Sequence, residues 1–120
     1  IPVVMTDERL VVRCITNLLS NSMKYAGESA HIEVSIYEFD EQPYKSVCIE
    51  VADNGPGIAQ AQLEEIFRPF TRLESARDKQ SGGYGLGLAI VKEAMKLLGG
   101  EVKASNRKES GLRVQLILPI

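Results

Sequence analysis

A helical repeat of apolar residues is the clearest pattern along the chain. Over residues 7–26, apolar side chains fall every three or four positions, which predicts an amphipathic helix. Thr6 is the expected N-cap, with Asp7 in the first turn, where an acidic side chain suits the helix dipole. Gly27 is the expected end of the helix, and residues 3–5 are expected to form a short strand before it. The apolar positions are Leu10, Val11, Cys14, Ile15, Leu18, Leu19 and Met23.

Alternating apolar and polar residues predict four longer strands. Residues 31–39 and 47–52 are expected to pair as an antiparallel hairpin, because only a short polar turn separates them. Residues 101–105 and 112–118 are expected to close the sheet as a second hairpin. The apolar face of the first strand consists of Ile32, Val34 and Ile36.

Two further helices and a long polar segment are predicted between the hairpins. A short helix is expected over residues 59–67 and a longer one over residues 85–98. Residues 68–82 have little apolar periodicity, and a loop of that length in a small domain is typical of a lid. We expect residues 72–82 of this lid to be disordered without a ligand. The predicted inner face of the longer helix is Leu86, Ala89, Ile90, Ala94, Leu97 and Leu98.

The order of these elements predicts an α+β fold. Consecutive strands are mostly joined as hairpins, whereas a doubly wound parallel fold would need strictly alternating strands and helices. We therefore expect one domain over residues 1–120, a two-layer α/β sandwich whose mixed, mostly antiparallel sheet carries its helices on one face. The 120-residue length is sufficient for one hydrophobic core.

Composition narrows the class of protein. The net charge of −2, with scattered basic residues, argues against nucleic-acid binding. No apolar run approaches the roughly 18 residues that a membrane span needs, and no signal peptide is visible, so no direct membrane contact is expected. Cys14 and Cys48 lack a metal-binding spacing and are interpreted as reduced core thiols of a cytoplasmic chain. His31 is interpreted as structural, and the start at Ile1 suggests a fragment of a longer protein.

A polar stripe runs along the first predicted helix. Arg13, Asn17, Asn21 and Lys24 share one face, which in most helices is simply the solvated side. Asparagine is nevertheless a poor helix former, and two of them one turn apart reduce helix propensity without a local benefit. Amide oxygens are hard ligands suited to Mg²⁺, and a lysine one turn further on could meet the phosphates of a nucleotide.

Two glycine-rich segments supply the other candidate chemistry. Asp53 follows an apolar strand, where a carboxylate needs hydrogen-bond donors such as the exocyclic amine of adenine, although an Asp-Asn-Gly turn is a common alternative. Residues 83–87 carry alternating glycines just before a helix, where backbone N–H groups can hold phosphate oxygens or the glycines can form a hinge. Between them, residues 67–72 are expected to anchor the lid, and Arg72 could reach a γ-phosphate or remain solvated.

Taken in order, four segments resemble the catalytic and ATP-binding domain of bacterial sensor histidine kinases. Residues 17–25 resemble the N box, residues 53–58 the first glycine box, residues 67–70 the F box and residues 83–88 the second glycine box. That domain belongs to the GHKL superfamily (gyrase, the large heat-shock chaperone, histidine kinases and mismatch-repair ATPases). The resemblance covers essentially the whole chain and implies the Bergerat α/β sandwich.

The resemblance also implies roles for particular residues. Asn21, assisted by Asn17, would bind Mg²⁺, and Lys24 would contact the phosphates. Asp53 would accept a hydrogen bond from the exocyclic amine of adenine. Catalytic roles fall to Asn21, Lys24 and Arg72. The implied nucleotide-binding set is Asn17, Asn21, Lys24, Tyr25, Asp53, Gly55, Gly57, Ile58, Phe70, Arg72, Tyr84, Gly85, Leu86, Gly87 and Leu88.

One departure from the superfamily pattern bears on the reaction. ATP-hydrolysing members carry a glutamate where this chain has Asn17, and an amide cannot act as a general base, so the sequence favours phosphoryl transfer over hydrolysis. The resemblance implies transfer to a histidine on a separate dimerisation domain of the same protein, and then to a response regulator. A GHKL serine kinase or ATPase, and a non-catalytic nucleotide-sensing docking module, are the alternatives.

Overall fold

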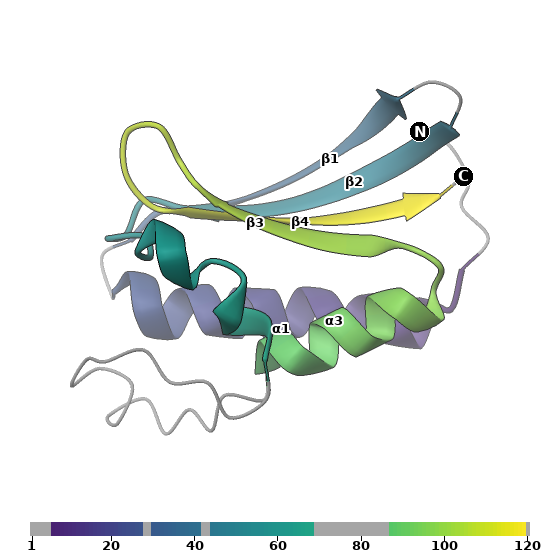
Figure 1. Ribbon diagram of the computed structural model, residues 1–120, viewed down its shortest axis with the longest axis horizontal. Coiled ribbons are helices and arrows are strands. Elements are labelled where there is room, and N and C mark those ends of the chain that lie inside the picture. The colour runs from purple at the N-terminus through teal and green to yellow at the C-terminus, as the bar shows by residue number, and fades with distance from the viewer. Residues whose placement is uncertain (1–5, 28–29, 42–43, 69–86, 120) are drawn as a thin grey trace.

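The computed structural model describes residues 6–27, 30–41, 44–68 and 87–119. Two α-helices and four strands dominate these ranges, with two short 3₁₀ helices between the hairpins (Figure 1). In chain order the elements are α1 (Glu8–Ala26), β1 (Ile32–Glu41), β2 (Tyr44–Asp53), η1 (Gln60–Gln62), η2 (Glu65–Phe67), α3 (Gly87–Leu97), β3 (Glu101–Asn106) and β4 (Leu112–Pro119).

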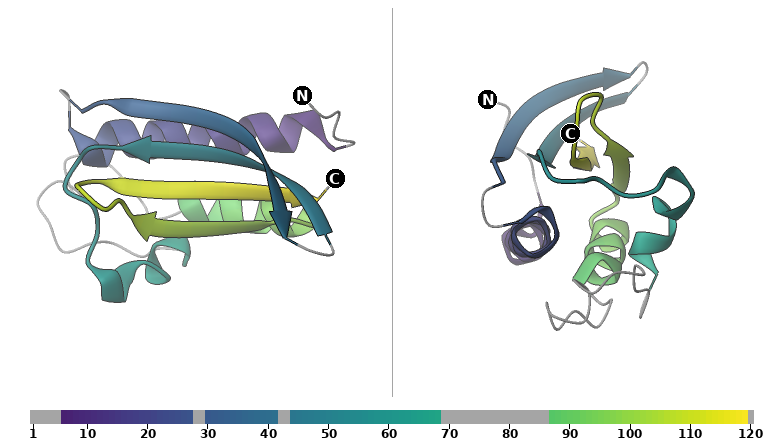
Figure 2. Two further views of the ribbon diagram at one scale, coloured as in Figure 1. Left: turned by 90° about the horizontal axis from the view of Figure 1, so that it is seen from above. Right: turned by 90° about the vertical axis from the view of Figure 1, so that its left-hand side faces the viewer.

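The four strands form one antiparallel sheet in the order β1-β2-β4-β3. β1 pairs with β2 and β3 pairs with β4, so each pair forms a hairpin. The two hairpins are joined by pairing of β2 with β4, in which Ile49 lies opposite Leu116. Both α-helices lie on the same face of the sheet, so the molecule has two layers (Figure 2). The predicted α+β sandwich is confirmed, and every neighbouring pair of described strands is antiparallel.

The hydrophobic core lies between the sheet and the two helices. Leu18 of α1, Val91 and Met95 of α3, and Val51 and Leu116 of the central strands are at most 2% exposed. Side chains of this size each contribute roughly 1.5–3 kcal/mol when they are fully buried. The core is therefore centred on β2 and β4, with α1 packed mainly against β2 and α3 mainly against β3.

Two predictions for the helices need correction at their ends and inner faces. Asp7, and not Thr6, caps α1, because its side chain accepts a hydrogen bond from the Arg9 N–H at 3.0 Å. Ala89 and Ala94 of α3 are buried as predicted, but Ile90 is 41% exposed and Leu97 is 78% exposed. The apolar residues of α3 surround most of the helix, so the pattern alone does not select the buried side.

The second set of corrections concerns the segments around the sheet. Residues 59–67 form two short 3₁₀ helices instead of one α-helix. Val34 and Ile36, on the apolar face of the first strand, are 49% and 61% exposed, because β1 is an edge strand and α1 packs mainly against β2. The predicted strand at residues 3–5 and the predicted lid, beyond Arg68, lie outside the described residues.

Candidate functional site

A buried carboxylate at the end of β2 is the centre of the candidate site. Asp53 is only 5% exposed, and its Oδ1 accepts hydrogen bonds from the Gly55 N–H at 2.9 Å and the Leu112 N–H at 3.3 Å. Within the described residues, both hydrogen bonds to this side chain end on Oδ1, and none ends on Oδ2. A carboxylate oxygen accepts more than one hydrogen bond, so Oδ2 can accept one from a ligand that presents an N–H or O–H group.

The loop after Asp53 is fixed against the end of α1. Asn54 and His31 exchange two bonds: the His31 N–H donates to Asn54 Oδ1 at 2.7 Å, and the Asn54 N–H donates to the His31 carbonyl at 3.2 Å. Gly55 is buried, and a Cβ there would lie 2.6 Å from Ala26 Cα, so only glycine fits without a shift. These contacts give His31 a backbone role in placing the loop.

The turn between β3 and β4 supports the same loop from the other side. Asn106 binds both backbone groups of Ile58, and the Arg107 guanidinium donates to the Asp53 carbonyl at 2.9 Å. The Ser110 hydroxyl donates to the Gly55 carbonyl at 2.6 Å. Sequence reasoning missed these partners, because they lie about 50 residues from the loop and no local motif marks them.

The predicted metal and phosphate residues lie in the middle and C-terminal part of α1. The C-terminal ends of α1 and β2 lie together on the left of Figure 1. Asn17 and Asn21 are partly buried, and Lys24 is exposed. The C-terminal end of α1 lies beside the Asp53 loop, because Gly55 packs against Ala26.

The remaining predicted site residues divide into two groups. Gly87 begins α3, Leu88 is 8% exposed within the core cluster, and Ile58 packs partly buried against that cluster. Tyr25 lies within α1, but its side chain is outside what the structure describes. The other predicted members also lie outside the described residues: Phe70, Arg72, Tyr84, Gly85 and Leu86.

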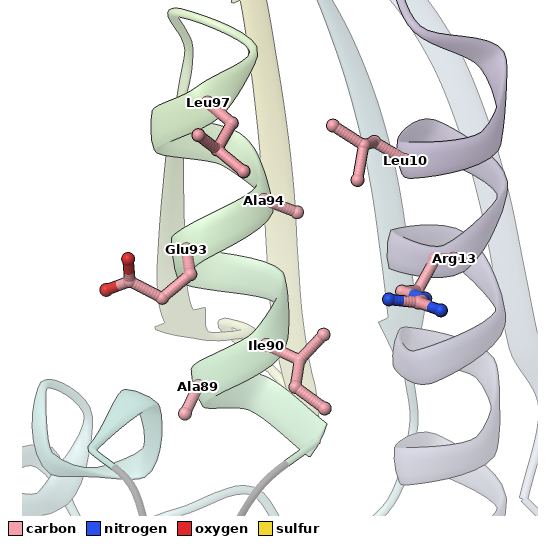
Figure 3. A pocket seen from close by; sticks show the side chains of 7 residues that line it. All are labelled: Leu10, Arg13, Ala89, Ile90, Glu93, Ala94 and Leu97. Carbon is pink, nitrogen blue, oxygen red and sulfur yellow. The ribbon is translucent and has the colours of Figure 1, made fainter.

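A separate groove lies between the N-terminal half of α1 and most of the length of α3. In Figure 3, Leu10 of α1 points toward α3 near Ala94, while Glu93 points away. The groove has a volume of about 280 Å³ and is mainly apolar. None of the predicted nucleotide-binding residues lines it, so its shape gives no information about the Asp53 site.

Among the described residues, three titratable side chains have raised pKa values: Cys14, Cys48 and Tyr37. Cys14 and Cys48 are free and buried, and burial raises the pKa of each thiol. Burial also contributes most to raising the pKa of Tyr37 to about 12, with hydrogen bonds to Cys48 and Glu50 adding to it.

Across the described ranges, no group of three or more His, Cys, Asp or Glu side chains could hold a metal ion. In the same ranges, no helix combines the length and apolar character required to cross a bilayer.

Sequence comparison shows the family to which this chain belongs. The model of the histidine kinase-, DNA gyrase B- and HSP90-like ATPase family matches residues 6–120, and the chain belongs to that family. It is 44% identical over 107 residues to the sensor histidine kinase GtrS of Pseudomonas aeruginosa, covering 89% of this chain and 20% of GtrS. It is 38% identical over 107 residues to the sensor histidine kinase CpxA of Escherichia coli, covering 88% of this chain and 22% of CpxA.

Structural comparison agrees with the sequence relatives. The mycobacterial sensor histidine kinase MprB superposes with a TM-score of 0.82 at 29% identity, over 97% of this chain and 76% of that one. Full-length ShkA in complex with AMPPNP superposes with a TM-score of 0.81 at 27% identity, over 99% of this chain and 23% of that one. The chain therefore has the fold of histidine kinase catalytic domains, and it spans about a fifth of the length of GtrS and of CpxA.

Proposed function

We propose that this chain is the ATP-binding kinase core of a two-component sensor histidine kinase. In this role it transfers the γ-phosphoryl group of ATP to a histidine on a separate dimerisation domain, from which a response regulator receives it. One observation carries the proposal: Asp53 is buried at the end of β2, with both protein donors on Oδ1. Family membership and the likeness to a solved structure that holds AMPPNP support it.

Asp53 recognises the base in this proposal. Its Oδ2 accepts a hydrogen bond from the exocyclic amine of adenine, while Oδ1 stays bonded to the Gly55 and Leu112 N–H groups. A hydrogen bond to a charged group contributes about 1.5–3 kcal/mol, so this contact is a major source of affinity. Gly55 and Gly57 let the flat ring approach the backbone, and Ile58 and Leu88 border it, with Tyr25 packing on the base.

The amide stripe of α1 serves the phosphates. Amide oxygens on two residues one turn apart fit Mg²⁺, which favours oxygen ligands, so Asn21 would hold the ion with help from Asn17. A bound Mg²⁺ ion would neutralise part of the negative charge of the phosphates. Lys24 adds a positive charge to the phosphates. By resemblance, the rest of the phosphate and lid contacts come from Phe70, Arg72, Tyr84, Gly85, Leu86 and Gly87.

The reaction favoured is transfer and not hydrolysis. Asn17 occupies the position from which ATP-hydrolysing GHKL members activate water, and its amide has no basic form at neutral pH. Phosphoryl transfer then depends on positioning and on charge neutralisation, with the acceptor imidazole as the nucleophile. Because the chain spans about a fifth of its relatives, we place the acceptor histidine in the remainder of a longer protein, with this part in the cytoplasm.

A labelling experiment distinguishes the proposal from its alternatives. The chain is incubated with γ-labelled ATP, Mg²⁺ and the protein's own dimerisation domain, beside an acceptor variant that lacks the histidine. We expect alkali-stable, acid-labile label on the intact acceptor only, and loss of that label with Asn21→Ala. Acid-stable label on serine would favour the serine kinase. Nucleotide binding without label on any acceptor would contradict transfer and favour the docking module.

A further inference from the structure

Asn106 makes a two-point contact with the loop that follows Asp53. The last residue of β3, Asn106 uses Oδ1 to accept the Ile58 N–H at 2.9 Å, while Nδ2 donates to the Ile58 carbonyl. One carboxamide thus satisfies both backbone groups of a single residue 48 positions away. Such a pair fixes the orientation of Ile58 as well as its position, because two bonds define a plane where one bond leaves a rotation free.

The loop is shaped to admit this contact. Gly57 has a φ of +75°, and a Cβ there would lie 2.7 Å from Asn106 Oδ1, so a side chain would displace the carboxamide. Asp53 is held from the same turn, by Arg107 at its carbonyl and by the Leu112 N–H at its carboxylate. The turn therefore determines how the wall residue Ile58 and the carboxylate of Asp53 lie relative to each other.

We propose that Asn106 is a positioning residue for base recognition, which sets the preference of this site for adenine over guanine nucleotides. The inference rests on the proposed function. Adenine presents an amine where guanine presents a carbonyl oxygen, so a carboxylate at that point pairs with the first and opposes the second. Sites that depend on a buried hydrogen bond discriminate only while the partner is held in place, and Asn106 holds the wall against which the base rests.

Three variants test this inference in the 120-residue chain. Asn106→Ala removes both bonds to Ile58. Asn106→Asp retains an acceptor for the Ile58 N–H and loses the donor to its carbonyl. Lys108→Ala, at an exposed position in the same turn, is the matched control. The dissociation constants of non-hydrolysable ATP and GTP analogues are measured for each variant, together with hydrogen exchange at the Ile58 amide.

We expect Asn106→Ala to weaken binding of the ATP analogue about tenfold, the equivalent of one or two hydrogen bonds, and to change GTP-analogue binding less than about twofold. Exchange at the Ile58 amide should accelerate, Asn106→Asp should show a smaller loss of preference in the same direction, and Lys108→Ala should match the wild type. An unchanged ratio of the two affinities in a folded Asn106 variant would overturn this inference alone. A folded wild-type chain that binds neither analogue would overturn the proposed function, and the inference with it.

Discussion

Asp53 illustrates, at the scale of one residue, how a carboxylate at the end of a buried strand obtains its hydrogen-bond donors. Its carboxylate is taken out of water at the end of β2, and the protein supplies donors to one of its two oxygens. The sequence indicated the residue, because a carboxylate after an apolar strand needs partners. It could not indicate that Leu112, 59 positions away, supplies one of them.

Tyr37 gives a prediction about pH at the same scale. Its hydroxyl donates to Glu50 Oε1 at 2.9 Å and accepts from Gln115 Nε2 at 2.7 Å, and its pKa is raised to about 12. In the unfolded chain the phenol ionises near its ordinary pKa of about 10. The stability contributed by the neutral phenol is therefore complete below pH 10 and is lost as the pH rises through the folded-state pKa.

We expect Tyr37→Phe to flatten the fall in unfolding free energy over this alkaline window. The free energy of unfolding of the wild type and of Tyr37→Phe is measured in urea at pH 9, 10, 11 and about 12. The difference between the two free energies at each pH isolates Tyr37, because the contributions of the other titrating groups cancel. Absorbance of tyrosinate should show one phenol that titrates at higher pH than the others in the wild type and is absent from Tyr37→Phe. Parallel pH profiles for the two proteins would contradict this explanation.

Turns between elements depend on glycine for two separable reasons. Gly27 and Gly111 have nearly the same φ, 104° and 106°, which is a positive value that favours glycine. A Cβ at Gly27 would meet nothing within 4 Å, whereas a Cβ at Gly111 would overlap the carbonyl oxygen of Asp53. Gly27 therefore measures the cost of the conformation alone, and Gly111 measures that cost together with a steric clash at the candidate site.

We expect Gly27→Ala to lower the unfolding free energy by roughly 1–2 kcal/mol, the cost of a left-handed conformation for an L-residue. Gly111→Ala should lose at least about 2 kcal/mol more, since its methyl group must displace backbone. Denaturant unfolding measures both values. Equal losses in the two variants would show that the turn at Gly111 relaxes freely and that the β3–β4 turn does not hold the Asp53 loop firmly.

The elements were predictable where the pattern was local. The period of the apolar residues located α1 and the strands, because one face of each meets a continuous core. It failed for Ile90 and Leu97, since α3 is apolar on several sides and its buried side is selected by α1 and the sheet. It also failed for residues 59–67, whose 3₁₀ geometry depends on packing of Ile66 and Phe67 against the core.

The whole molecule connects two distant halves of the chain around one site. The first hairpin supplies Asp53, and the second hairpin supplies the turn with Asn106 that positions the following loop. The order of the motifs predicted the sandwich, and the set of nucleotide-binding residues stays a prediction. The support from the β3–β4 turn was not predictable, because it arises only when β2 and β4 pair.

The most direct test of the account is calorimetric titration of the chain with a non-hydrolysable ATP analogue, with and without Mg²⁺, beside Asp53→Asn. This substitution retains an oxygen for the Gly55 and Leu112 N–H groups and replaces the acceptor offered to adenine with a donor. The account predicts saturable binding that Mg²⁺ strengthens, and a loss of about ten- to hundredfold in the variant. A folded wild-type chain that does not bind, or a variant that binds equally well, would contradict it.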